Sequence, residues 1–131
     1  MNLQEIVHQY RGATLPKLVE KQIKALNEGA LLQAIQGTYH HFPIEFRKQV
    51  DAFTHAYVKN WLAPHIFTKD LGDIFSDTVR DIKGMATQAG VSLTDEQVFD
   101  VFNLIVQKVS YFAHIDPEFR KNWGIKKGWF S

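Results

Sequence analysis

Residues 98–115, VFDVFNLIVQKVSYFAHI, decide the fold of this chain. Apolar side chains recur here at the three- and four-residue spacing of a helix, and the inner set is Val98, Val101, Phe102, Ile105, Val109 and Phe112. Phe99 and Leu104 widen this face until only a thin polar stripe is left. A helix that is apolar over most of its girth is normally buried among other elements. We therefore expect this helix to lie at the centre of the fold, with Thr94 and Gln97 forming a capping box at its start.

The flanking sequence predicts amphipathic helices on both sides of this stretch. Their expected positions are 3–10, 15–26, 30–36, 43–61, a helix that starts at 68 or 70 and runs to 89, and a short one after Pro117. Asn27 and Gly29 are predicted to end the second helix, and Gly37 the third. Pro43 is expected in the first helical turn of a long helix that Pro64 ends.

No stretch alternates with the two-residue period of a strand, so no sheet is expected. The predicted fold is therefore all-α: an irregular antiparallel bundle of four main amphipathic helices plus shorter ones, with the 95–115 helix central. Residues 1–131 are expected to form a single domain, with 124–131 as an irregular aromatic and basic tail.

Composition restricts the classes of function. Hydrophobic residues make up 45% of the 131 residues and charged residues 22%, which excludes a disordered chain. The net charge of +1 argues against broad binding to nucleic acid. The absence of cysteine excludes disulfides, zinc–thiolate sites and thiol catalysis. We see no signal peptide and expect a cytoplasmic protein, and charges such as Asp100 and Lys108 argue against a membrane span in the central helix.

The polar stripe of the central helix is the first candidate site. Its members Asp100, Asn103, Gln107, Ser110 and His114 follow one another at helical spacing. A buried stripe could orient a ligand, whereas an exposed one would simply be the solvated side of the helix. The candidate ligand-binding residues are Asn103, Gln107, His114, His40 and His41.

The histidines do not make a convincing metal site. No two of them have the His-x-x-x-His spacing that places two ligands on one helical face, so no metal ligand is assigned and no cofactor is predicted. A metal or a tetrapyrrole with an axial histidine stays open as an alternative. Ser110, His114 and Asp116 lack any sign of an oxyanion site, so no catalytic residue is assigned.

Two charged segments allow further interpretations. Asp70, Asp73, Asp77 and Asp81 form an acidic ridge, expected to be a solvated face rather than a cation site. The C-terminal segment interleaves lysine and arginine with Phe119, Trp123, Trp129 and Phe130. Those four aromatic residues are predicted to clasp the end of the bundle or to form a dimer interface, with stacking on nucleic acid as a weaker alternative.

These observations favour binding over catalysis. The leading hypothesis is a homo-oligomeric protein-interaction module, a dimer, without catalysis. The alternative is a helical bundle, with or without enzymatic activity, that binds a small molecule or metal through the polar stripe and histidines. A third is weak nucleic-acid binding through the tail.

Overall fold

The computed structural model describes residues 2–61 and 64–122, the side chains at 64, 65, 119, 120 and 122 excepted. In these residues the elements are α1 (Leu3–Tyr10), α2 (Leu15–Ala25), α3 (Glu28–Tyr39), the 3₁₀ helix η1 (Ile44–Phe46), α4 (Arg47–Asn60), the 3₁₀ helix η2 (Pro64–Phe67), α5 (Leu71–Gln88), α6 (Asp95–Ile115) and α7 (Pro117–Asn122). The described chain has no strand, only an isolated bridge between Thr14 and Asp70. The all-α fold expected from the sequence is confirmed.

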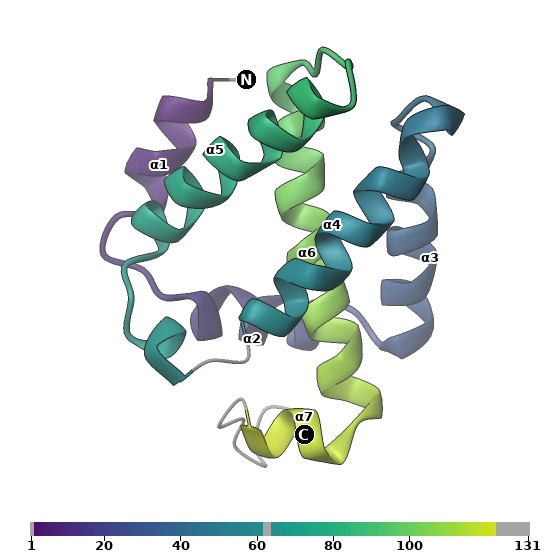
Figure 1. Cartoon of the computed structure of the whole chain (residues 1–131). Helices are drawn as coiled ribbons and strands as arrows, with labels where there is room; N and C mark the ends of the chain where they lie inside the picture. Colours follow the sequence, from purple (N-terminus) through teal and green to yellow (C-terminus); the bar gives the residue numbers. More distant parts are fainter. Residues whose placement is uncertain (1, 62–63, 123–131) are drawn as a thin grey trace.

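Helix α6 is the centre of the molecule, as its sequence predicted. It runs through the middle of the bundle and contacts α2, α3, α4 and α5 around its sides and α7 at its end (Figure 1). Val101, Leu104, Ile105 and Val109 are fully buried. The Thr94 side chain accepts a hydrogen bond from the backbone N–H of Gln97, and the Gln97 side chain accepts one from the backbone of Thr94. The predicted capping box is thus present.

The predicted break between the second and third helices was wrong in detail. Asn27 does not end α2 but begins α3, because its side-chain oxygen accepts a hydrogen bond of 2.8 Å from the backbone N–H of Ala30. An asparagine serves a helix start better than a helix end when its side chain can satisfy a free backbone donor. Gly29 and Gly37 both lie inside α3, whose buried Leu31 and Ile35 hold it in place.

The long helix also differs at both ends from the expectation. Pro43 is followed by the 3₁₀ turn η1, and the α-helix begins only at Arg47. The turn buries Phe46 against the core, and such tight turns are common at helix starts. At the other end α4 stops at Asn60, before Pro64 is reached, and buried Trp61 forms its C-terminal cap.

Aromatic rings join α1, α4 and α5 to the central helix. Phe102 of α6 contacts Phe75 at 4.8 Å between ring centroids, Tyr10 at 5.9 Å and Trp61 at 5.9 Å. Edge-on and tilted ring pairs at such distances stabilise a core beyond the apolar area that they bury. In the described part of the chain, no helix has both the length and the apolar character needed to cross a membrane.

Candidate functional site

A cleft of about 560 Å³ opens between the C-terminal half of α4, η2 and α5. Its apolar wall consists of Trp61, Ile66 and Ile74, which are all buried members of the core. Trp61 is held against Phe102 of the central helix, so this wall is part of the packed interior rather than of a loop. The core therefore fixes the floor of the cleft, and Trp61, Ile66 and Ile74 reach its surface with only a small part of each side chain.

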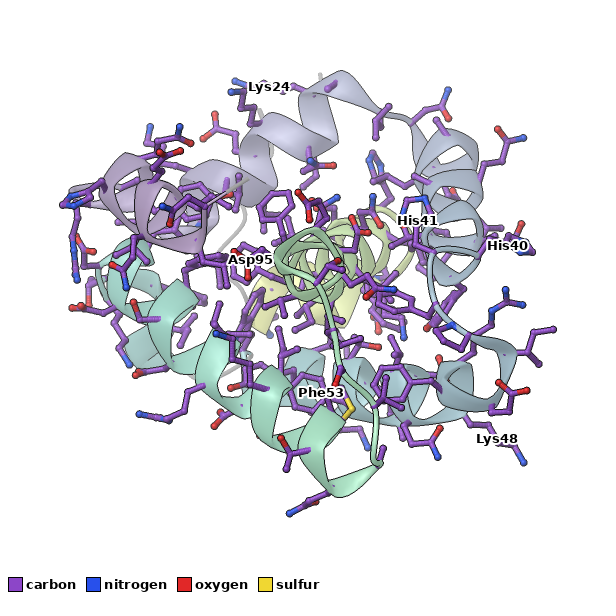
Figure 2. All side chains as sticks on the ribbon, turned by 90° about the horizontal axis from the view of Figure 1, so that it is seen from above. Lys24, His40, His41, Lys48, Phe53 and Asp95 are labelled. Atoms are coloured by element: carbon purple, nitrogen blue, oxygen red, sulfur yellow. The ribbon has the colours of Figure 1, made fainter. Side chains whose placement is uncertain are left out.

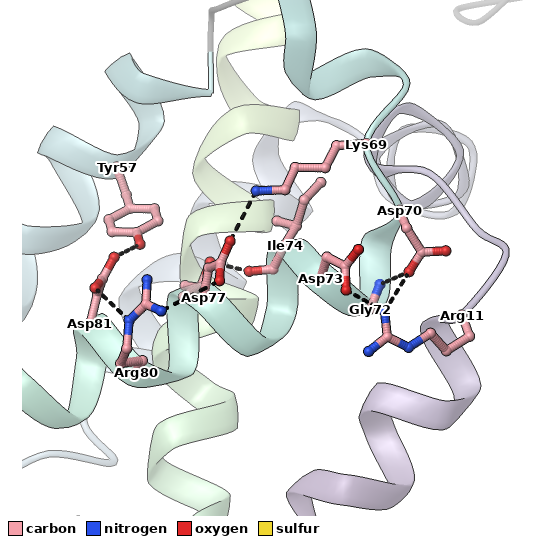
Figure 3. Close-up of polar contacts among 11 residues, drawn as sticks. Arg11, Tyr57, Lys69, Asp70, Gly72, Asp73, Ile74, Asp77, Arg80 and Asp81 are labelled. Carbon is pink, nitrogen blue, oxygen red and sulfur yellow. Dashed lines mark hydrogen bonds and ion pairs between the residues drawn. The ribbon is translucent and has the colours of Figure 1, made fainter.

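The polar rim of the cleft begins with a tyrosine–carboxylate pair. The Tyr57 hydroxyl of α4 donates a hydrogen bond to Oδ2 of Asp81 of α5 (Figure 3). Burial raises the pKa of Tyr57 above its ordinary value, and the bond to the Asp81 carboxylate raises it further. The phenol therefore stays protonated at physiological pH and cannot act there as a phenolate.

A lysine–carboxylate pair lies beside the tyrosine. The Lys69 Nζ donates to Oδ2 of Asp77 at 2.9 Å, and this hydrogen bond holds the pKa of Asp77 below its ordinary value. The guanidinium of Arg80 lies 3.7 Å from Asp77 and 3.8 Å from Asp81, which is ion-pair range but too long for hydrogen bonds. Figure 3 shows these side chains in a row along α5.

The acidic ridge predicted on this helix is a set of paired carboxylates. Asp70 caps α5 by accepting from the backbone N–H of Gly72 at 2.8 Å, and it accepts from the N–H of Gly12 at 2.7 Å. These backbone hydrogen bonds lower the pKa of Asp70, with that from Gly12 contributing most. Asp73 binds the guanidinium of Arg11. Each ridge carboxylate therefore has a partner within the chain.

The polar stripe of α6 is only partly exposed, and one of its members contacts α3. Gln107 is 7% exposed, and its Oε1 accepts a hydrogen bond of 3.3 Å from the Thr38 hydroxyl. Ser110 is fully buried and donates to the carbonyl of Val106. Asn103 and His114 are half-buried. Gln107 thus joins the stripe to α3, and the cleft between α4 and α5 contains none of the stripe's members.

The two adjacent histidines point in different directions. His40 is exposed and points away from the bundle, whereas His41 points toward α6 (Figure 2). His41 Nδ1 lies 2.9 Å from Oδ2 of Asp100, and the Gln97 amide donates to the His41 carbonyl at 3.1 Å. The structure thus joins His41 to the stripe at Asp100. Among the described residues, no three histidine or carboxylate side chains gather closely enough to hold a metal ion.

The predicted interface residues cannot be placed. Phe119 belongs to α7 by its backbone, but its side chain and the residues Trp123, Trp129 and Phe130 lie outside the described part of the structure. The dimer interface therefore stays a prediction.

No known family model, curated protein or solved structure matches this chain. The candidate site consequently rests on its own geometry and chemistry.

A second polar cluster was missed entirely by the sequence reasoning. Lys108 of α6 reaches Asp51 at 3.1 Å and the Thr54 hydroxyl at 2.7 Å, and its Nζ lies 5.4 Å from the centre of the Tyr39 ring. Tyr39 in turn donates to Asp51 at 2.7 Å. Burial lowers the pKa of Lys108, although the contact with Asp51 opposes that shift. This cluster ties α3 and α4 to the central helix.

The cleft itself had only a faint signal in the sequence. The regular aspartates of 70–81 were visible, but their partners Tyr57 and Lys69 come from another helix and from the segment before α5. The paired spacing of Asp77 and Asp81 by four residues places both on one helical face and was the one usable hint.

Proposed function

We propose that this chain binds a small amphipathic molecule in the cleft between α4 and α5. The observation that carries the proposal is the meeting of a buried apolar wall, formed by Trp61 and Ile74, with the rim pairs Tyr57–Asp81 and Lys69–Asp77. Ligand sites are typically concave and combine an apolar wall with polar groups that fix orientation. Most described residues that line this cleft are polar or charged, so polar contacts would dominate the binding. A volume of about 560 Å³ falls in the range of such sites.

The proposal keeps the binding hypothesis from the sequence but places it elsewhere. Asn103, Gln107, His114, His40 and His41 were the candidates for ligand contact. Of the three on α6, Gln107 contacts α3, and Asn103 and His114 are half-buried. The rim of the cleft, by contrast, has exposed polar groups beside apolar wall. Tyr57, kept protonated, can serve a ligand as a hydrogen-bonding group, and binding is the function proposed.

Trp61 provides a direct readout of this binding. The chain has three tryptophans, so the double variant Trp123→Phe/Trp129→Phe leaves Trp61 as the sole one. We expect a ligand in the cleft to change the emission of Trp61 and to raise the melting temperature of the full chain, because it binds only the folded state. The ligand panel comprises short fatty acids, aromatic acids, amines and alcohols.

A matched pair of variants locates the site. Asn60 and Lys48 are both exposed on α4, but only Asn60 lines the cleft. Asn60→Phe places a large ring at the cleft without adding a tryptophan and should weaken binding about tenfold or more, whereas Lys48→Phe should leave it unchanged. A panel without any binder, or a binder indifferent to Asn60→Phe, would overturn the proposal.

The homo-oligomeric interaction module and the cytoplasmic location stay predictions from the sequence. Native mass spectrometry of the full chain, compared with a chain truncated after Asn122, tests the first. A dimer that is lost on truncation would support the predicted interface of Trp123, Trp129 and Phe130, and a full-length monomer would refute it.

A further inference from the structure

We infer that the ligand of the α4–α5 cleft is an organic monoanion, with a carboxylate-type head and an apolar body. This inference rests on the proposed function and names the class of ligand. It follows from the balance of hydrogen-bond donors and acceptors around the rim, and from the sum of the charges there.

The acceptors of the rim are already engaged. Asp81 accepts from the Tyr57 hydroxyl, and Asp77 accepts from Lys69 at 2.9 Å. Both carboxylates also lie within ion-pair range of Arg80. A cationic ligand would have to compete with these internal donors for the same oxygens.

The donors of the rim are in surplus. A guanidinium carries five N–H donors and an ammonium three. Arg80 is 73% exposed and, among the described residues, makes two long contacts, with Asp77 and Asp81, while Lys69 donates a hydrogen bond to Asp77. Lys59 lines the cleft with no ion pair to any other residue in the described ranges. The remaining N–H groups suit the oxygens of an anion.

The charges of the rim limit the ligand to a single negative charge. Among the described residues of the rim, Lys59, Lys69 and Arg80 contribute three positive charges, and Asp77 and Asp81 contribute two negative ones. One negative charge balances the difference, whereas a second would be repelled by the nearby carboxylates. A carboxylate also matches the planar fork of Arg80 in a two-point hydrogen bond.

The apolar wall lies at the right place for the body of such a molecule. Ile74 precedes Asp77 by three residues and Thr78 by four on α5, so all three side chains share one helical face. Ile74 and Thr78 are buried, and Trp61, the C-terminal cap of α4, lines the same cleft. A head bound by Lys69 and Arg80 would therefore leave its chain over the small parts of Trp61 and Ile74 that reach the cleft surface.

Three probes share an alkyl body of equal length and differ only in the charge of the head group. They are octanoate, octan-1-ol and octylammonium. Titration calorimetry of the full chain at neutral pH should show octanoate binding at least about tenfold more tightly than either of the others, as expected for hydrogen bonds to charged groups. Octyl phosphate, with its second negative charge, should bind more weakly than octanoate.

Arg80→Gln and Lys83→Gln form the matched variants, since each removes one exposed positive charge from α5 but only Arg80 lines this cleft. Arg80→Gln should weaken octanoate about tenfold and leave octanol unchanged, and Lys83→Gln should alter neither. Equal or tighter binding of octanol or octylammonium would overturn the inference while leaving the proposed function standing. Equal losses in both variants would also overturn it, and binding of no probe at all would count against both proposals.

Discussion

The ammonium of Lys108 lies 3.1 Å from a carboxylate oxygen of Asp51, yet the Lys108 side chain is only 12% exposed and that of Asp51 is 68% exposed. The two halves of this ion pair therefore have different access to water. Lys108 depends on Asp51 and on the Thr54 hydroxyl at 2.7 Å to keep its charge inside the molecule. Asp51, in contrast, can be hydrated without Lys108 and keeps its hydrogen bond from Tyr39.

This asymmetry predicts unequal effects of removing each partner. Asp51→Asn should lower the free energy of unfolding by about 1–2 kcal/mol, because it leaves a largely buried ammonium without its counter-charge. Lys108→Met should lower it by less than about 1 kcal/mol, because methionine retains much of the apolar stem and leaves no buried charge. Urea unfolding of both variants measures the difference. A larger loss for Lys108→Met than for Asp51→Asn would contradict this account of the pair.

The Asp51 carboxylate also predicts how the free energy of unfolding changes at acidic pH. The hydrogen bond from Tyr39, followed by that from Lys108, lowers the pKa of Asp51 from its ordinary value of 3.8. The folded protein therefore binds this proton less readily than the unfolded chain, so the stabilisation is complete above the ordinary value and is lost as pH falls through the lower folded value. Between about pH 5 and pH 2 the unfolding free energy of the wild type should fall more steeply than that of Asp51→Asn.

Tyr39→Phe serves as the partial control for this pH effect. It removes the first contributor to the shift and keeps Lys108, so its acid slope should lie between those of the wild type and Asp51→Asn. Urea unfolding at a series of pH values gives all three slopes. Parallel curves for the wild type and Asp51→Asn would show that this carboxylate titrates normally in the folded state.

The sequence was sufficient for the fold because periodicity is a local property. Residues 98–115 are apolar on nearly every side, and only the middle of a bundle can bury such a helix. Helix boundaries were less certain, since Asn27 suits either the end of one helix or the start of the next, and only the direction of its side chain decides. Pro43 likewise fits the first turn of either an α- or a 3₁₀-helix.

The polar sites could not be predicted from the sequence, because their members are distant from one another along the chain. Lys108 lies in a mostly apolar helix with nothing nearby in the sequence to mark its burial, and Asp51 is 57 residues away. Asp77 and Asp81 could be recognised as a charged face, but Tyr57 and Lys69, which turn that face into a cleft, come from other segments. Such pairings follow from the packing of helices and not from any spacing along one helix.

Gly72 is predicted to be required at the start of α5. A Cβ atom there would lie 2.9 Å from Oδ1 of Asp70 and 3.0 Å from Cδ of Arg11. Arg11 can move, but Asp70 cannot shift without losing its hydrogen bonds to the backbone of Gly12 and Gly72. Gly72→Ala should therefore lower the free energy of unfolding by about 1–2 kcal/mol, through strain and a weakened cap.

Gly84→Ala is the matched control in the same helix. Gly84 is exposed, and no neighbouring atom of the described residues lies within 4 Å of the Cβ that it would gain. Alanine should there raise the free energy of unfolding by about 0.5–1 kcal/mol, because glycine loses more backbone freedom in a helix. Thermal and urea unfolding of the two variants should move in opposite directions. A stabilised Gly72→Ala would mean that Asp70 is not fixed by its cap.

The capping box of α6 predicts that Thr94, although exposed, stabilises the fold, whereas another exposed threonine does not. The Thr94 hydroxyl accepts a hydrogen bond of 3.1 Å from the backbone N–H of Gln97, a donor that has no partner within the helix. Thr94→Ala should therefore lower the free energy of unfolding by about 1 kcal/mol. Thr87, also exposed, donates back to the carbonyl of Lys83 in its own helix, so Thr87→Ala should be neutral or slightly stabilising.

Urea unfolding measures both effects. Because α6 contacts most of the bundle, the loss in Thr94→Ala should appear as a shift of the single global transition in urea, with its slope unchanged. Equal effects of the two substitutions would show that the cap adds nothing to the packing of the central helix.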